Sequence, residues 1–351
     1  MTGRERFAMA LAHREPDRIP YTDAPWETTV ARWRHEGMPA DVAVKDYFGF
    51  EEQRFGTDVS LRLALATLEE TDRYTVIRDA NGAMKRTWRH ATSVPEYVDF
   101  AIKTPQDWQS LPERSRTFSP DRVHPGLLAG LNAARENGRF TNFFAHIGFN
   151  QALYVVGMET LLVAMATEPA WASEMFDFTA EMAVAGAREL IRQGAVLDGA
   201  FVADDMGCSR GPVFSPTMYR ELVQPCHAKV CAFFAEHDLP VTLHSCGNVM
   251  SLVPDIIDAG FACLQPLEVK AGMDLLKLKH DHGGRLALMG GLDARTLTDV
   301  DRMRDELARK IPAAMAGGGY IMHSDHSIPD DVPLANFQEF IRYGLELGTY
   351  P

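Results

Sequence analysis

The sequence predicts an α/β protein in which eight parallel strands alternate with helices and close into a (β/α)8 TIM barrel, with a helical and hairpin elaboration near the N-terminus. Three observations favour this fold. Six short apolar runs separated by helix-length segments follow residue 139, two earlier segments supply further strands, and no long linker, repeat or low-complexity segment divides the chain. We therefore expect one barrel domain spanning residues 1–351.

The N-terminal part supplies the first two predicted strands. A short amphipathic helix ends before Pro16, which breaks helices, and residues 18–23 follow as the first strand. Residues 59–65, VSLRLAL, are the second. Asn81-Gly82 is a strong hairpin signal, so we expect a hairpin excursion around residues 67–90 that lies over the active face.

The other six strands follow from the repeated order of apolar runs and helices. These runs are FTNFFAHIGF, LDGAFVADDMG, LPVTLHSCG, FACLQPLEV, RLALMGGLD and GGYIMHSDHSIP. Helix ends are visible between them: Ser215 and Pro216 suit the N-cap and first helical positions, and glycines 317–319 suit a left-handed helix end.

Composition narrows the class of protein. The 351 residues are 46% hydrophobic and 24% charged, as in a soluble enzyme, and the net charge of -13 disfavours nucleic acid and anionic membranes as partners. No apolar run is long enough to span a bilayer. Five cysteines without a secretory signal argue against a disulfide framework. We expect a cytoplasmic protein with a small-molecule or protein partner, and a homo-oligomer is compatible with the sequence.

A metal site is predicted at the end of the run LPVTLHSCG. His244 and Cys246 are two residues apart, so both side chains lie on one face of the strand and reach one point beyond its end. Imidazole with thiolate favours zinc, and a catalytic zinc has three protein ligands and an open position. His326 is the favoured third ligand, with Glu268 as a third or fourth candidate.

Polar residues at other predicted strand ends are candidates for catalysis, because barrel chemistry takes place at the C-terminal ends of the strands. His146, Asp204 and Asp205 follow two neighbouring strands. Adjacent residues on a strand point to opposite faces, so only one of the two aspartates should enter the site. The aspartate in the site would serve as a general base, orient the substrate or support a ligand histidine. Alternatively, one of the two aspartates has only a structural role and caps the following turn.

Several segments together resemble the uroporphyrinogen decarboxylase superfamily over nearly the whole chain: RERFAMALAHREPDRIP, SPTMYRELVQP, HSCGNV, LQPLEVKAGMD, MGGLDARTL and HSDHSIPDDVPLANF. The resemblance implies a (β/α)8 barrel and either a decarboxylase or a zinc-dependent methyltransferase of corrinoid systems. The arginine-rich MRQAGR-type segment of the decarboxylases is missing from YTDAPWETTVARWRHEG. The histidine-x-cysteine of the methyltransferases matches His244 and Cys246, and His326 replaces their further cysteine.

The resemblance therefore implies a zinc-dependent methyltransferase that moves a methyl group from a small methylated donor to the cobalt of a corrinoid (cobalamin) carried by a partner protein. Because His326 stands in place of a thiolate, two neutral imidazoles and one thiolate would leave the zinc a stronger Lewis acid that polarises oxygen, so we expect the donor to be a methyl ether or a similar compound. Asp204 or Asp205 and His146 would orient or protonate the leaving group. Two alternatives remain: a decarboxylase acting on a porphyrinogen or another acid, and a non-catalytic protein that binds a corrinoid or a metal.

Overall fold

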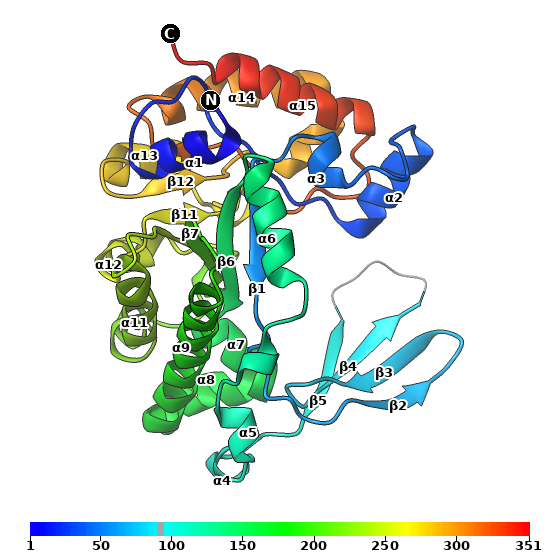
Figure 1. Cartoon of the computed structure of the whole chain (residues 1–351), viewed down its shortest axis with the longest axis vertical. Helices are drawn as coiled ribbons and strands as arrows, with labels where there is room; N and C mark the ends of the chain where they lie inside the picture. The colour runs from blue at the N-terminus through cyan, green and yellow to red at the C-terminus, as the bar shows by residue number, and fades with distance from the viewer. Residues whose placement is uncertain (90–94) are drawn as a thin grey trace.

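A seven-stranded parallel sheet forms the centre of the molecule (Figure 1). The computed structural model describes residues 1–89 and 95–351. The strands lie in the order β1 (Glu52–Gly56), β6 (Phe140–His146), β7 (Gly199–Ala203), β10 (Val241–His244), β11 (Cys263–Gln265), β12 (Ala287–Met289) and β13 (Tyr320–Ile321). The six strands predicted after residue 139 are thereby confirmed.

Residues 18–23 join the two edges of this sheet. Met322 N–H donates to the Pro20 carbonyl at 2.9 Å, and on the other side Glu51 N–H donates to the Tyr21 carbonyl at 3.0 Å. A parallel bridge pairs Tyr21 with Met322. Because the segment bonds to neighbours of both β13 and β1, it occupies the eighth position, and the predicted (β/α)8 fold is confirmed.

The second strand was predicted in the wrong place. The strand is β1, and residues 59–65 form no regular element. Ser60 N–H and hydroxyl both bond to the Asp58 carboxylate, at 3.0 and 2.6 Å, which turns the chain. The Arg122 guanidinium donates hydrogen bonds to the carbonyls of Asp58 and Ser60, so a neighbouring strand cannot pair with these two carbonyls.

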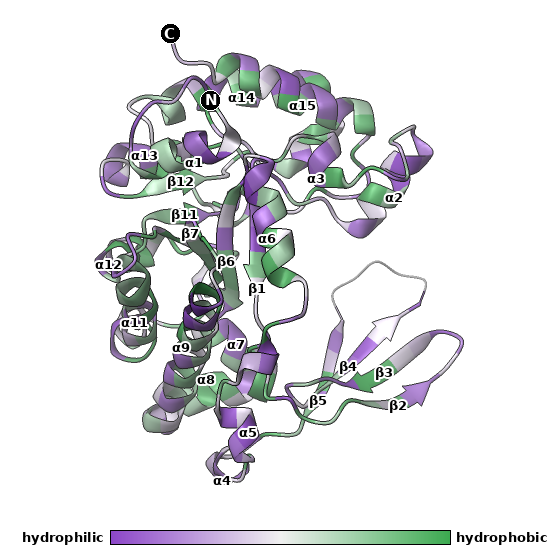
Figure 2. Cartoon of the chain, in the orientation of Figure 1, coloured by the Kyte–Doolittle hydropathy of each residue, from purple (hydrophilic) through white to green (hydrophobic). Residues whose placement is uncertain are grey.

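Helices surround the sheet, and their mixed hydropathy along the chain is visible in Figure 2. Their bounds are α1 (Gly3–Leu11), α2 (Glu27–His35), α3 (Val44–Tyr47), α4 (Pro105–Gln109), α5 (Glu113–Arg116), α6 (Leu127–Glu136), α7 (Gly148–Val156), α8 (Met158–Thr167), α9 (Pro169–Arg192), α10 (Pro216–Met218), α11 (Gln224–Ala235), α12 (Val253–Asp258), α13 (Leu275–His282), α14 (Val300–Met315) and α15 (Leu334–Leu347). The Ser215 hydroxyl accepts from Met218 N–H, which confirms the predicted N-cap.

Helix α1 closes the N-terminal end of the barrel. Its buried residues Phe7, Ala10 and Leu11 join a cluster with inward-facing strand residues Phe140, Phe201, Cys263, Ala287, Met289 and Ile321. Phe7 and Phe140 stack with ring centroids 5.5 Å apart. Since apolar side chains fill this end, the polar residues that follow the strands gather at the opposite, C-terminal end, which we call the mouth.

An antiparallel sheet projects beside the C-terminal ends of β1 and β6 (Figure 1). It comprises β2 (Ala66–Glu70), β3 (Tyr74–Arg78), β4 (Ala83–Trp88) and β5 (Glu96–Phe100), and Asn81-Gly82 lies in the β3–β4 turn as predicted. Residue 90, where the predicted excursion ends, lies outside the described residues. Tyr97 of β5 stacks on Tyr154 of α7 at 6.0 Å, which attaches the sheet to the barrel. A two-stranded ribbon, β8 (Gly207–Cys208) with β9 (Gly211–Pro212), follows β7.

Within the described residues, no single helix has both the length and the apolar character needed to cross a membrane. The pair α7 and α8, bent by 115°, meets the criterion jointly by length and composition.

Candidate metal centre

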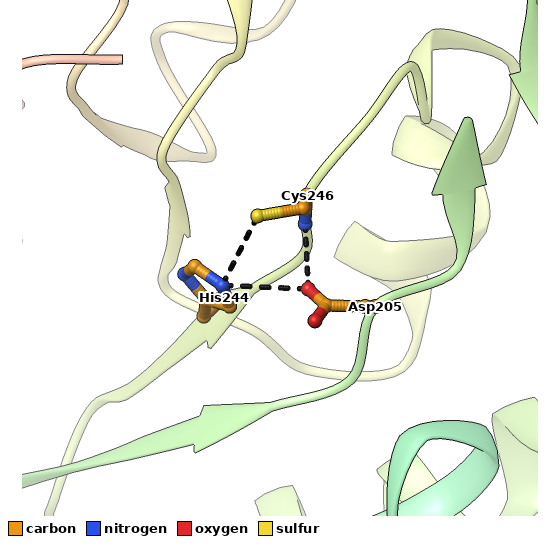
Figure 3. Close-up of side chains that lie close together, drawn as sticks. All are labelled: Asp205, His244 and Cys246. Atoms are coloured by element: carbon orange, nitrogen blue, oxygen red, sulfur yellow. Dashed lines mark hydrogen bonds and ion pairs between the residues drawn. The ribbon is translucent and has the colours of Figure 1, made fainter. Parts of the chain in front are cut away.

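Asp205, His244 and Cys246 converge at the mouth, where strands β7 and β10 end (Figure 3). His244 Nε2 lies 3.3 Å from Asp205 Oδ1 and 3.5 Å from Cys246 Sγ. One ligand atom from each residue lies within 4.8 Å of those of the other two. The three side chains thus surround one point with an imidazole nitrogen, a thiol and a carboxylate.

Close backbone contact between the loops after β7 and β10 holds these side chains together. Gly207 N–H donates to the Cys246 carbonyl at 3.2 Å, and Asn248 N–H donates to the Cys208 carbonyl at 2.9 Å. Gly247 takes φ +78°, and a Cβ on it would lie 2.3 Å from the Gly207 carbonyl carbon. Only glycine allows this approach, so the glycine after Cys246 fixes the spacing between the thiol and Asp205.

Gln265 orients the His244 ring. Its side-chain oxygen accepts a short hydrogen bond from His244 Nδ1, so Nδ1 keeps its proton and Nε2, which faces Asp205 and Cys246, is the nitrogen that a metal ion would bind in place of a proton. A second hydrogen-bonded partner of this kind is typical of metal-binding histidines because it fixes the tautomer and the ring orientation.

The charges of the group favour a cation at its centre. Burial lowers the pKa of His244, but the hydrogen bonds and charges of Asp205 and Cys246 outweigh it and raise that pKa to about 10. Burial likewise raises the pKa of Asp205, yet His244 outweighs it and holds the pKa below its ordinary value. Both shifts have the direction expected where negative groups surround a positive charge, which is the environment that a metal cation needs.

Replacing Gln265 with leucine is expected to lower the affinity for zinc about tenfold to a hundredfold, because His244 loses the acceptor that fixes its tautomer. Gln265→Glu keeps an acceptor at the same position and serves as the matched control. Competition with a chromogenic chelator measures both affinities. Equal losses in the two variants would contradict a role for the side-chain oxygen.

Asp204 points away from this group, as the strand alternation predicts for one of the two aspartates. Its side chain is fully buried, and its carboxylate lies 2.8 Å from His227 Nε2 and accepts from Phe149 and Asn150 N–H at 3.2 and 2.6 Å. The Tyr219 hydroxyl bonds to the other ring nitrogen of His227 at 3.0 Å. Asp204 thus holds the start of α7 against α11 and does not border the mouth.

His146 lies beside the group and is linked to it through Asn150. His146 Nδ1 bonds to the Asn150 side-chain oxygen at 2.8 Å, and the Asn150 amide nitrogen reaches Asp205 Oδ2 at 3.4 Å. Burial lowers the pKa of His146. We did not anticipate Asn150 from the sequence; the signal for it was its position four residues after His146, on the first turn of the helix that follows the strand.

Glu268 and His326 lie outside the group. Glu268 accepts from Gly247 N–H at 2.6 Å and pairs with Lys270 at 2.9 Å, so its two oxygens hold the loop that carries Cys246. His326 packs beside Trp26, with ring centroids 6.4 Å apart. Among the described residues, the third possible metal ligand close to His244 and Cys246 is therefore Asp205, and neither Glu268 nor His326 belongs to the group.

The donor set fits a zinc ion. A thiol, an imidazole with its tautomer fixed and a carboxylate are all zinc ligands, and three protein ligands at an open barrel mouth leave a fourth position for a substrate atom. The close approach of the Gly207 and Gly247 loops holds two of the three ligands independently of any ion. The arrangement therefore suits a catalytic site better than a closed structural site.

Comparisons with known proteins agree with this architecture. Residues 101–345 match the family described as "Uroporphyrinogen decarboxylase (URO-D)". The chain is 26% identical over 168 residues to "Methylcobamide:CoM methyltransferase MtaA" of Methanosarcina barkeri, a match covering 48% of this chain and 47% of that protein. The chain thus spans about half the length of this curated relative. A solved structure, "methyltransferase from Methanosarcina mazei", superposes with a TM-score of 0.70 at 17% identity and covers 99% of both chains.

Fold and site together define a (β/α)8 barrel with a candidate metal centre at its mouth. The family match covers more than half of the chain, including every strand of the central sheet after β1. This protein belongs to the uroporphyrinogen decarboxylase family, which confirms the resemblance drawn from its sequence motifs.

Proposed function

We propose that the protein is a zinc-dependent methyltransferase that moves a methyl group from a small methylated donor, a methyl ether, to the cobalt of a corrinoid protein. The convergence of Asp205, His244 and Cys246 carries this proposal. The likeness to a methylcobamide methyltransferase supports it. We further propose that residues 1–351 act as one domain.

We assign Asp205, His244 and Cys246 as the metal ligands. Asp205 takes the third position, for which the sequence favoured His326, because its carboxylate already lies 3.3 Å from His244 Nε2. Zinc bound here would polarise the oxygen of the donor, while the corrinoid of the partner would accept the methyl group. A carboxylate is a harder ligand than a second thiolate, so this set suits an oxygen-containing substrate.

The protein's own residues would position the donor and its leaving group. Burial keeps His146 neutral, and its Nδ1 is occupied by Asn150, so Nε2 is available to accept a hydrogen bond or a proton. Because Asn150, on the first turn of α7, holds the His146 ring in place, His146 would orient the donor beside the metal ligands. The donor oxygen would keep the electron pair of the broken carbon–oxygen bond.

Methyl transfer to a thiol is a second candidate function. The relative from Methanosarcina barkeri is named for transfer from a methylcobamide to CoM, which favours this direction. The two candidates differ in which compound binds at the fourth metal position, an ether oxygen or a thiol sulfur.

Metal analysis and a methyl-transfer assay test the proposal together. We expect plasma mass spectrometry to find about one zinc per chain. We also expect methyl ethers to methylate cob(I)alamin, a reaction that the change in the absorption spectrum of the cobalamin measures. Transfer from methylcobalamin to thiols alone would favour the second candidate. A metal-free protein that decarboxylates an acid would replace both with the decarboxylase alternative, and corrinoid binding without turnover would indicate a binding protein.

A further inference from the structure

An arginine lies inside the barrel, on strand β1. Arg54 pairs in register with Asn142 of β6, which in turn pairs with Gly199 of β7. The side chains of Glu52 and Asn142 are joined by a hydrogen bond of 2.9 Å, and both residues are buried. Arg54, two residues after Glu52, faces the same interior. Beyond Glu52 and Asn142, the inward residues Phe140 and Phe201 of β6 and β7 are apolar, so a cation on this face calls for an explanation.

The Arg54 side chain extends toward the mouth. Its guanidinium carbon lies 3.3 Å from the ring centroid of Phe201, which is two residues nearer the mouth than Gly199, the β7 residue at the level of Arg54. The Phe201 ring in turn lies 6.0 Å from the ring of His244. One aromatic ring therefore separates the cation from a proposed metal ligand.

Part of the Arg54 side chain is accessible although it lies in the interior. The Arg54 side chain is 28% exposed, whereas that of Glu52 is 4% exposed. Its Nε donates to Glu52 Oε1 at 2.8 Å, and within residues 1–89 and 95–351 neither Nη1 nor Nη2 donates a hydrogen bond to the protein. Since α1 fills the N-terminal end, we infer that a ligand reaches these two nitrogens from the mouth.

A purely structural ion pair does not account for this geometry. Glu52 already accepts from Asn142, and the pair with Arg54 uses one of the five guanidinium N–H groups. Stacking on Phe201 and the Nε hydrogen bond hold the plane of the guanidinium in place. What remains is a fixed fork of donors facing the mouth, the arrangement that binds a carboxylate through two parallel hydrogen bonds.

We propose that Arg54 binds a carboxylate of the small-molecule substrate, while the reacting end of that molecule lies at Asp205, His244 and Cys246. The placement of the reacting end at these three residues rests on the proposed function, but the binding of a carboxylate by Arg54 does not. The substrate class is thereby a small organic acid about one aromatic ring long between its carboxylate and its reacting group.

Calorimetric binding of matched acids and amides tests this proposal. One pair is 4-methoxybenzoate with 4-methoxybenzamide, and a second pair is 3-mercaptopropionate with 3-mercaptopropionamide, so that an acid on the methyl donor is distinguished from an acid on a thiol acceptor. We expect the native protein to bind at least one acid about tenfold to a hundredfold more tightly than its amide. Arg54→Met should abolish that preference and Arg54→Lys should reduce it, because lysine lacks the planar fork.

Lys85→Met is the matched control. Lys85 lies near the mouth over Tyr97 but is paired with Asp79 at 2.7 Å, so its loss should leave the preference unchanged. Thermal unfolding checks that the Arg54 variants are folded, and Arg54→Lys replaces Arg54→Met in the comparison if the latter is not. Equal binding of acid and amide by the native protein, or an undiminished preference in the Arg54 variants, would overturn the proposal.

Zinc content measured on the same samples separates this inference from the proposed function. A zinc-loaded native protein without acid preference would overturn the role of Arg54 alone. A protein without zinc whose acid preference still depends on Arg54 would overturn the metal assignment and leave the carboxylate site standing.

Discussion

His244→Ala and Cys246→Ser are each expected to lower the affinity for zinc by on the order of a thousandfold, since each removes one of three ligand atoms. His244 is the last residue of β10, and Cys246 lies in the loop after it, which backbone hydrogen bonds and Glu268 hold, so the fold should persist. Metal content after dialysis against a weak chelator measures the loss, and circular dichroism checks the fold.

Two control variants are expected to retain zinc. Cys208→Ser is the matched thiol control, because the Cys208 thiol is exposed and donates to the Gly211 carbonyl at 3.1 Å. His326→Ala should retain zinc because His326 lies beside Trp26 and outside the group. Loss of zinc in His326→Ala would indicate that His326 is a zinc ligand and would contradict the assignment of Asp205 as the third ligand.

Asp204→Asn and Asp205→Asn are expected to affect different properties of the protein, stability and zinc affinity respectively, although the residues are adjacent. Asp204 accepts from His227 and two backbone N–H groups in a fully buried position, and an amide nitrogen there would face donors. We expect Asp204→Asn to lower the free energy of unfolding by about 3–5 kcal/mol. Urea denaturation of the metal-free protein measures it.

Asp205→Asn should lower the stability of the metal-free protein much less than Asp204→Asn does, because its side chain is 35% exposed at the mouth and only its pairing with His244 is lost. Its zinc affinity should fall at least about a hundredfold through the loss of a charged ligand. The pair of variants is its own control, since both remove one carboxylate charge from neighbouring positions. Similar stability losses in both would contradict the separate roles assigned here.

The positions of the later strands could be predicted because buried parallel strands leave continuous apolar runs in the sequence. Strand β1 could not: it reads Glu-Gln-Arg-Phe-Gly, since Glu52 and Arg54 face the barrel interior and compensate each other there. The apolar segment 59–65 offered a better pattern, but the Arg122 guanidinium donates to the carbonyls of Asp58 and Ser60 and so blocks strand pairing where the segment begins.

The candidate site was predictable to the same partial degree. The spacing of His244 and Cys246 follows from strand geometry alone, so sequence sufficed to place them together. Choosing between Asp205 and His326 needed the relative height of loops from strands far apart in sequence, which the contact of Gly207 with Gly247 sets. Asn150 and Gln265 act through single hydrogen bonds to His146 and His244. The spacing of four residues hinted at the first pair, but Gln265 lies 21 residues from His244, and no local pattern indicates that pairing.

The filling of the N-terminal end by α1 has a kinetic consequence. A barrel closed at one end has a single entrance, so under the proposed function the small acid and the macromolecular corrinoid carrier must use the same opening. The acid has to enter before the carrier covers that opening, and the demethylated product can depart only after the carrier has left. Under the proposed function, plugging one end of the barrel would thus impose a compulsory order of binding and release.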